Sequence, residues 1–140
     1  MQKQKMSWDS FDMLSDQIIE NYRDVGIKKI VGLTRGGLPL AVKISNVLGI
    51  PMETLLWQTR DGDAQEVTKL LKLNRAYNIN EVLFVDEICD SGRTISEINL
   101  YFPLAMFTVL IDKVPEQGLV DYTPEVKWVH EDRWIVFPWE

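Results

Sequence analysis

Three acidic residues follow an apolar run in the stretch VLFVDEICDSGRTI, Val82 to Ile95. Asp86 and Glu87 come directly after four apolar residues, and Asp90 opens the run Asp-Ser-Gly-Arg-Thr. Carboxylates at the end of a buried strand can hold sugar hydroxyls, or Mg²⁺ through its water shell. The glycine and the two hydroxyl residues that follow can offer backbone N–H and O–H donors to a phosphate. These residues predict a phosphate site beside an acid that handles a metal or a proton.

A second loop with glycines, Thr34-Arg35-Gly36-Gly37, follows the apolar run KIVGL. The two glycines remove side chains where a ligand would approach the backbone closely. In a parallel sheet, ligands bind at the carboxyl ends of the strands. We therefore expect both loops to contribute to one site.

Apolar runs alternate with amphipathic segments along the chain, and this pattern predicts the elements that position the two loops. We expect strands at Lys29–Leu33, Pro51–Trp57, Val82–Val85 and Met106–Ile111, and helices from a Ser7 cap to Tyr22, over Leu38–Leu48 and over Thr94–Tyr101. The region from Gln58 to about Asn80 gives a poorer signal, in which EVTKLLKL is a candidate short helix. The sequence predicts a single α/β domain over residues 1–140, with a mostly parallel sheet flanked by helices.

Composition limits the classes of partner. The formal net charge of −6 disfavours a nucleic-acid partner, because binding phosphates normally requires a basic surface. Cys89 is the single cysteine, so an intrachain disulfide is impossible and a reducing cytoplasm is the expected location. The chain contains no apolar run of membrane-spanning length, and no apolar segment follows its basic N-terminus, so we expect neither a membrane association nor a secretory signal.

Three ordered motifs resemble those of the type I phosphoribosyltransferases. The stretch from Val82 to Ile95 resembles the signature that binds phosphoribosyl pyrophosphate (PRPP). IVGLTRGGLPLAVKISNVLGIP, residues 30–51, resembles the pyrophosphate loop and the helix after it. DRWIVFPWE, residues 132–140, resembles the purine-binding end of the xanthine-guanine enzymes. The resemblance implies the type I phosphoribosyltransferase fold, a mobile active-site loop over about 58–80, and a small C-terminal purine-binding hood within about 113–140.

The resemblance also implies a reaction, in which Mg-PRPP and a purine base give a nucleoside 5′-monophosphate and pyrophosphate. Mg²⁺ is the implied cofactor, near Asp86 and Glu87, which would also face the ribose hydroxyls. Asp90 would accept or position the proton at purine N7. The other implied contacts are Asp90, Ser91, Gly92, Arg93 and Thr94 for the 5′-phosphate; Thr34, Arg35, Gly36 and Gly37 for pyrophosphate, with a cis Thr34–Arg35 peptide; and Ile88, Lys113, Trp134 and Ile135 for the purine. Relatives are usually homodimers or homotetramers.

The chain departs from the family pattern in two places. Glu87 stands where many relatives have aspartate, a change that keeps a carboxylate. The Ser-Tyr pair of many purine relatives is missing from WQTRDGDAQEV, where Arg60 is the candidate substitute phosphate contact. Asp61-Gly62-Asp63 lacks the remaining spacing of a calcium loop, and the lone His130 is expected at the surface.

Simpler interpretations compete with two of the assigned roles. Lys113 ends a strand and is alternatively a solvent-exposed lysine, and Trp134 is alternatively a core aromatic beside Trp128 and Phe137. Cys89 fits an apolar loop residue better than a nucleophile. A 6-oxopurine is favoured over adenine, because a lysine ammonium only donates hydrogen bonds. Guanine, xanthine and hypoxanthine are not ranked, and the alternatives are a transferase for adenine or a pyrimidine and a non-catalytic PRPP sensor.

Overall fold

The computed structural model describes residues 2–58, 65–124 and 133–140. The strands in these ranges are β1 (Gln2–Lys5), β2 (Lys29–Thr34), β3 (Met52–Leu56), β4 (Val82–Cys89), β5 (Met106–Asp112) and β6 (Arg133–Val136). The helices are α1 (Trp8–Tyr22), α2 (Leu38–Leu48), α3 (Val67–Ala76) and α4 (Arg93–Ile98), with a 3₁₀ turn at Pro115–Gln117. Within these ranges, no helix combines the length and the apolar composition needed to cross a bilayer.

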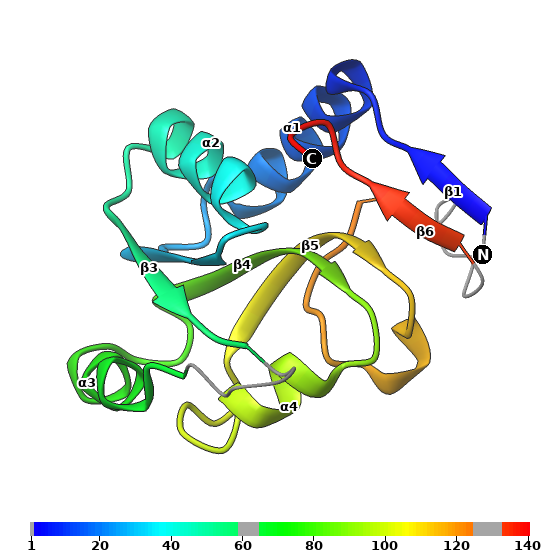
Figure 1. The fold of residues 1–140 in the computed structure, drawn as a ribbon. Coiled ribbons are helices and arrows are strands. Elements are labelled where there is room, and N and C mark those ends of the chain that lie inside the picture. Colours follow the sequence, from blue (N-terminus) through cyan, green and yellow to red (C-terminus); the bar gives the residue numbers. More distant parts are fainter. Residues whose placement is uncertain (1, 59–64, 125–132) are drawn as a thin grey trace.

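Four parallel strands form the main sheet in the order β3-β2-β4-β5. The central pair aligns Ile30 with Leu83, and the next pair aligns Leu83 with Met106. Helices α1 and α2 cover one face of this sheet, and α3 and α4 cover the other (Figure 1). The predicted α/β class and parallel sheet are confirmed.

Local sequence signals account for several element boundaries. The Ser7 hydroxyl accepts a hydrogen bond of 3.0 Å from the Ser10 amide and caps α1, whose Leu14 and Ile18 are completely buried. Helix α2 has the predicted bounds and ends at Gly49, whose positive φ of 68° suits glycine. Strands β2, β4 and β5 are longer than the predicted apolar runs and include the first residues after them. Because the strands are parallel, the loops that follow all begin at the same edge of the sheet.

The predicted loop over residues 58–80 is too long. Residues 67–76 form α3, because Leu70 and Leu73 lie on one helical face and are buried beneath the sheet. The candidate helix within EVTKLLKL is therefore correct. Arg60, Asp61 and Asp63 lie outside the described residues. Helix α4 begins at Arg93 and ends at Ile98, one residue earlier and three residues earlier than expected.

A small second sheet pairs the two ends of the chain. Strand β1 runs parallel to β6, with Gln2 opposite Arg133 and Lys5 opposite Val136. The pairing continues where the Met6 amide donates to the Val136 carbonyl oxygen at 2.8 Å. Figure 1 shows this sheet beyond the carboxyl ends of β4 and β5. Strand β1 was not predicted from the sequence.

Candidate active site

The ends of β2 and β4 bring the two predicted loops together. Gly32 of β2 lies opposite Val85 of β4, one residue before Asp86. A methyl group on Gly36 would overlap the Glu87 carboxylate, and one on Gly37 would meet the Val85 carbonyl oxygen at 2.6 Å. Both glycines are needed because the first loop packs directly against the acid pair.

The surroundings of Asp86 and Glu87 disfavour ionisation of the Asp86 carboxyl group. Asp86 Oδ1 accepts a hydrogen bond of 2.9 Å from the Glu87 amide. Desolvation raises the pKa of Asp86 well above its ordinary value, and the neighbouring Glu87 carboxyl raises it further. A cation at this position would relieve both effects, so the donor chemistry fits a bound divalent metal.

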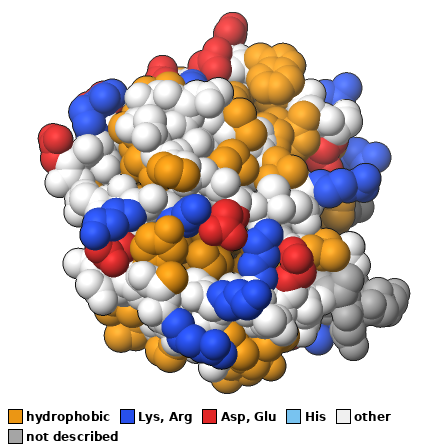
Figure 2. All heavy atoms as spheres, turned by 90° about the vertical axis from the view of Figure 1, so that its left-hand side faces the viewer, with side chains coloured by type: hydrophobic (Ala, Val, Ile, Leu, Met, Phe, Trp, Pro, Cys, Tyr) orange, Lys and Arg blue, Asp and Glu red, His pale blue; other side chains and the backbone are white. Residues whose placement is uncertain are grey.

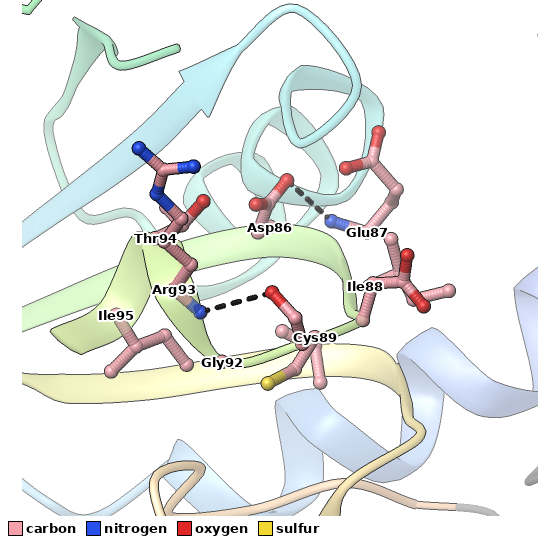
Figure 3. A pocket seen from close by; sticks show the side chains of 11 residues that line it. Asp86, Glu87, Ile88, Cys89, Gly92, Arg93, Thr94 and Ile95 are labelled. Atoms are coloured by element: carbon pink, nitrogen blue, oxygen red, sulfur yellow. Dashed lines mark hydrogen bonds between the residues drawn. The ribbon is translucent and has the colours of Figure 1, made fainter. Parts of the chain in front are cut away.

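The second loop encloses a cavity of about 220 Å³ at the carboxyl end of β4. Its walls are Asp86 to Ile95 together with Val109. Gly92 has a positive φ of 87°, and the Ser91 hydroxyl accepts from the Arg93 amide at 3.3 Å. Figure 3 shows the Arg93 side chain on the same side of the loop as the Asp86 carboxylate. This cavity contains the hydroxyl groups and backbone donors that the sequence assigned to a phosphate.

A second cavity, also about 220 Å³, lies between this loop and the small sheet. It is lined by Glu87, Ile88, Asp90, Lys113, Trp134, Ile135, Phe137 and Glu140. Glu87, Ile88 and Asp90 line both cavities, so the two spaces are neighbours along one loop. All the residues predicted to contact a purine line this second cavity.

Lys113 is buried in the wall of the second cavity. Its side chain is 7% exposed, so the alternative of a solvent-exposed lysine is wrong. Its Nζ donates to the Arg133 carbonyl oxygen at 2.6 Å and lies 3.4 Å from Asp90 Oδ1. The Lys113 amide also donates to the Cys89 carbonyl oxygen at 2.9 Å. One ammonium group therefore connects the end of β5, the loop after β4 and strand β6.

Trp134 is not a core residue. Its side chain remains 43% exposed, whereas Ile135 and Phe137 on the other face of the segment are 5% and 4% exposed. Phe137 stacks on Trp139 with ring centroids 5.2 Å apart. The buried aromatic rings support the segment from behind, and the indole of Trp134 is left free to face a ligand.

The first loop packs against the acid pair but lines neither cavity. The Thr34–Arg35 peptide bond is cis, as the family resemblance implied. Arg35 is exposed at the end of β2, and neither Thr34 nor Arg35 lines either cavity. The structure thus brings together the predicted phosphate, metal and purine residues, with Arg35 at their margin.

Nearly the whole chain matches one known protein family. The phosphoribosyl transferase domain family matches residues 3–139 of the chain. The chain belongs to this family. It is therefore a phosphoribosyltransferase, an enzyme of the glycosyltransferase class.

Individual relatives of the phosphoribosyltransferase agree with this assignment. A xanthine-guanine phosphoribosyltransferase of Cereibacter sphaeroides is 31% identical over 118 residues, which are 81% of this chain and 69% of the relative. The crystal structure of a purine phosphoribosyltransferase from Pyrococcus horikoshii has a TM-score of 0.68 and 26% identity, covering 100% of this chain and 95% of the other. A xanthine-guanine-hypoxanthine phosphoribosyltransferase of Helicobacter pylori shares the fold, with a TM-score of 0.61 and 18% identity over 99% and 93% of the two chains.

The carboxylates of the transferase suit Mg²⁺ better than a metal caged by protein alone. In residues 2–58, 65–124 and 133–140, no three or more His, Cys, Asp or Glu side chains gather as a metal cluster. Mg²⁺ commonly keeps several waters and binds through one or two carboxylates plus substrate phosphates. Asp86 and Glu87 supply such a pair.

Cys89 of the transferase is suited to packing and not to nucleophilic catalysis. Its side chain is 4% exposed, and its sulfur points to the opposite side of the loop from the Asp86 and Glu87 carboxylates (Figure 3). Burial and the nearby Asp112 carboxylate raise the pKa of the thiol to about 12. The thiol is therefore neutral at physiological pH. Trp128 and His130, for which the sequence predicted a core and a surface position, lie outside the described residues.

Three residues that shape the site were assigned no role from the sequence. Phe137 and Glu140 line the second cavity, and the Glu140 carboxylate accepts from the Phe137 amide at 2.8 Å. Gln117 supports the other cavity, because its Nε2 donates to the Ser91 carbonyl oxygen at 3.2 Å. Phe137 and Glu140 lie within the C-terminal motif DRWIVFPWE, which was a usable signal for both. Gln117 carries no local sequence signal.

Proposed function

We propose that the enzyme transfers the 5-phosphoribosyl group from Mg-PRPP to a 6-oxopurine, in purine salvage. The products are the nucleoside 5′-monophosphate and pyrophosphate, and the base is guanine, xanthine or hypoxanthine. The observation that carries this proposal is the buried Lys113 ammonium beside Asp90, in the cavity that Trp134 also lines. Family membership and the named relatives support it.

The purine site follows from the chemistry of the second cavity. In this proposal the base lies between Trp134 and Ile88, with its 2-substituent at the backbone of Ile135. Lys113 donates to the 6-oxo group. Adenine offers a donating amino group at this position, so its 6-substituent would face the lysine without an acceptor. The segment 113–140 thus acts as the base-binding part of the domain.

The PRPP site occupies the first cavity and the acid pair. The backbone and hydroxyl groups from Asp90 to Thr94 hold the 5′-phosphate, and Asp86 and Glu87 hold the ribose hydroxyls. Mg²⁺ bound at these carboxylates, directly or through water, would neutralise charge that develops on the leaving pyrophosphate. Thr34, Arg35, Gly36 and Gly37 contribute backbone groups and a positive charge to the pyrophosphate side.

The bond changes assign a role to Asp90. Purine N9 forms a bond to the anomeric carbon as the bond from that carbon to the pyrophosphate oxygen breaks. The base loses a proton, and Asp90 accepts or positions that proton at N7. The Lys113 ammonium lies 3.4 Å from Asp90 Oδ1, so the group that would donate to the base and the group that would take up its proton are neighbours.

Two other readings remain as competing hypotheses. A transferase for adenine or a pyrimidine would use the same PRPP site with different base contacts. A non-catalytic PRPP sensor acting on nucleic acid would need a basic surface. On the face shown in Figure 2, Lys and Arg side chains lie among apolar and acidic ones, and the whole chain carries a net charge of −6. These charges favour small-molecule substrates over nucleic acid.

Assembly and location are part of the same proposal. We expect a homodimer or homotetramer, for which exposed apolar side chains on α1 and α2 offer contact area; Trp8, Met13, Val42 and Val47 are 44–55% exposed. A cytoplasmic location is expected from the single cysteine.

A panel of bases tests the proposed function. The purified chain is incubated with Mg-PRPP and, separately, guanine, xanthine, hypoxanthine, adenine, orotate or uracil, and nucleotides are separated by chromatography. We expect nucleotide from at least one 6-oxopurine. Nucleotide from adenine or a pyrimidine alone would replace the base assignment. PRPP binding without any nucleotide, at high enzyme concentration, would support the sensor.

A further inference from the structure

Glu97 accepts hydrogen bonds from three different segments of the chain. Its Oε2 accepts from Arg93 Nε at 2.9 Å, one helical turn earlier on α4. Its Oε1 accepts from Trp57 Nε1 at 3.2 Å and from Gln65 Nε2 at 3.0 Å. The Glu97 side chain is 25% exposed, whereas that of Arg93 is 63% exposed. A partly buried carboxylate therefore connects the loop after β4 to the segments that flank residues 59–64.

The carboxylate of Glu97 is fixed independently of Arg93. Trp57 is 5% exposed and packs against Tyr101, with ring centroids 5.9 Å apart, so its indole N–H has a defined direction. Trp57 and Gln65 also pair as an antiparallel bridge. The flanking Leu56 and Glu66 exchange hydrogen bonds, from the Glu66 amide to the Leu56 carbonyl oxygen at 3.0 Å and from the Leu56 amide to Glu66 Oε1 at 2.6 Å.

The geometry points to Glu97 as a positioning residue that holds the Arg93 guanidinium toward a phosphate group of PRPP. Arg93 lines the first cavity. Among the described residues, the guanidinium hydrogen bond recorded for Arg93 uses Nε, which leaves both Nη groups for an anion. An arginine with two parallel donors suits phosphate oxygens. This inference rests on the proposed function and adds a side-chain contact to the backbone donors of the loop.

A positioning role makes a different prediction from a purely structural one. A solvent-exposed ion pair contributes little to folding stability. An arginine side chain has many rotamers, and fixing it in one of them when a ligand binds costs free energy. If Glu97 already holds the Arg93 side chain in place, that cost is smaller. Loss of Glu97 should therefore weaken PRPP binding specifically, and it should act through Arg93. If Glu97 instead competed with the phosphate for Arg93, its loss would tighten PRPP binding.

Glu97→Gln is the informative variant. The glutamine keeps the shape and one acceptor oxygen for Trp57 and Gln65, but its amide group cannot accept from Arg93. The control is Glu20→Gln on α1, which alters a comparable pair: Glu20 accepts from Arg23 Nη2 at 2.8 Å, away from both cavities. Binding of Mg-PRPP is measured by calorimetry without a base, beside steady-state kinetics for both substrates.

We expect Glu97→Gln to raise the PRPP dissociation constant and Michaelis constant about five- to tenfold, a coupling typical of residues in one network. In Glu97→Gln the Michaelis constant for the purine should change less than about twofold. In Glu20→Gln the PRPP dissociation constant and both Michaelis constants should also change less than about twofold. Arg93→Ala, at an exposed side chain, should weaken PRPP binding as well. Adding Glu97→Gln to Arg93→Ala should then have little further effect.

Unchanged or tighter PRPP binding in Glu97→Gln would overturn the inference while leaving the proposed function intact, as would full additivity with Arg93→Ala. If Glu97→Gln does not fold, unchanged binding in Arg93→Ala overturns the inference by itself. A wild-type chain that binds no PRPP would instead refute the proposed function, and this inference with it.

Discussion

Lys113 Nζ lies 3.4 Å from Asp90 Oδ1 and 2.6 Å from the Arg133 carbonyl oxygen. The purine-selecting group and the proton-handling group of the proposed mechanism are thus neighbours, and the same ammonium anchors strand β6.

Lys113→Met should reduce the preference for hypoxanthine over adenine, because the donor to the 6-oxo group is lost. It should also destabilise the fold by about 1–3 kcal/mol, because the partly buried Arg133 carbonyl oxygen loses the hydrogen bond from Lys113. The ratio of kcat/KM for the two bases, beside thermal unfolding, measures both effects. An unchanged ratio would remove Lys113 from base selection.

Asp90→Asn should lower kcat far more than it weakens PRPP binding. Asparagine keeps the shape of the loop but cannot take up the proton of the base. General acid–base catalysis typically contributes about 10²–10⁴-fold, which is the expected loss in turnover. Single-turnover rates and PRPP calorimetry on one preparation separate the two effects. Turnover close to wild type would exclude Asp90 from proton transfer.

Trp134→Ala should raise the Michaelis constant of the purine and leave that of PRPP nearly unchanged. Base stacking on an aromatic side chain is worth about 1–3 kcal/mol, which corresponds to about a 5- to 150-fold change. Because the side chain is 43% exposed, the melting temperature should fall little. Trp134→Phe keeps an aromatic face and should recover most of the affinity. A large fall in melting temperature with an unchanged purine constant would argue against stacking.

Gly36→Ala should weaken binding of Mg-PRPP through Glu87. The added methyl group would overlap the Glu87 carboxylate, which must then leave its position beside Asp86. Calorimetric titration with Mg-PRPP should show the loss. Combining Gly36→Ala with Glu87→Asp shortens the acid and should restore part of the binding. Unchanged Mg-PRPP binding in Gly36→Ala would mean that the site tolerates displacement of the Glu87 carboxylate.

Tyr22 should make the folded state sensitive to alkaline pH. Its side chain is 3% exposed, and burial raises the pKa of the phenol well above the ordinary value of about 10. Above pH 10 the unfolded chain releases this proton and the native chain retains it, so stability falls as pH rises. The expected loss is about 1 kcal/mol for each pH unit above 10, until the folded-state pKa is reached. The contribution of the Tyr22 phenol to folding stability is fully present below pH 10.

Tyr22→Phe provides the comparison for that pH dependence. The Tyr22 hydroxyl is buried and lacks a hydrogen-bond partner among the described residues, so its removal should cost less than about 1 kcal/mol at pH 8. Denaturant unfolding of both proteins at pH 8 and at pH 11 gives the free energy of unfolding that each protein loses between the two pH values. Wild type should lose more stability than Tyr22→Phe. Equal losses would show that folding does not raise the pKa of the Tyr22 phenol.

The motifs predictable from the sequence are those with short-range signals. The apolar runs of β2, β4 and β5 end in polar loops, and the alternation of strand and helix predicts that these loops share one edge of a parallel sheet. Asp86, Asp90 and the two glycines of the first loop were therefore identifiable as neighbours before any coordinates. Helix α2 was predictable to the residue because Pro39 and Gly49 mark its ends.

The remaining features depend on contacts between distant parts of the chain. Strand β1 is the polar segment Gln2–Lys5, which has no alternating pattern, and it forms because β6 offers an edge more than a hundred residues later. The burial of Lys113 depends on the Arg133 carbonyl oxygen of that same strand. Glu97 resembles any exposed helical glutamate until Trp57 and Gln65 are placed beside it. These relationships are set by tertiary packing, which local periodicity does not encode.

The most direct test of the central claim is the initial rate of nucleotide formation from Mg-PRPP with hypoxanthine, guanine and xanthine, compared with adenine, at equal base concentration. We expect at least one 6-oxopurine to give its 5′-monophosphate and an equal amount of pyrophosphate, at a rate well above that for adenine, and we expect chelation of Mg²⁺ to abolish the reaction. Preferential conversion of adenine, or PRPP binding with no product from any base, would contradict it.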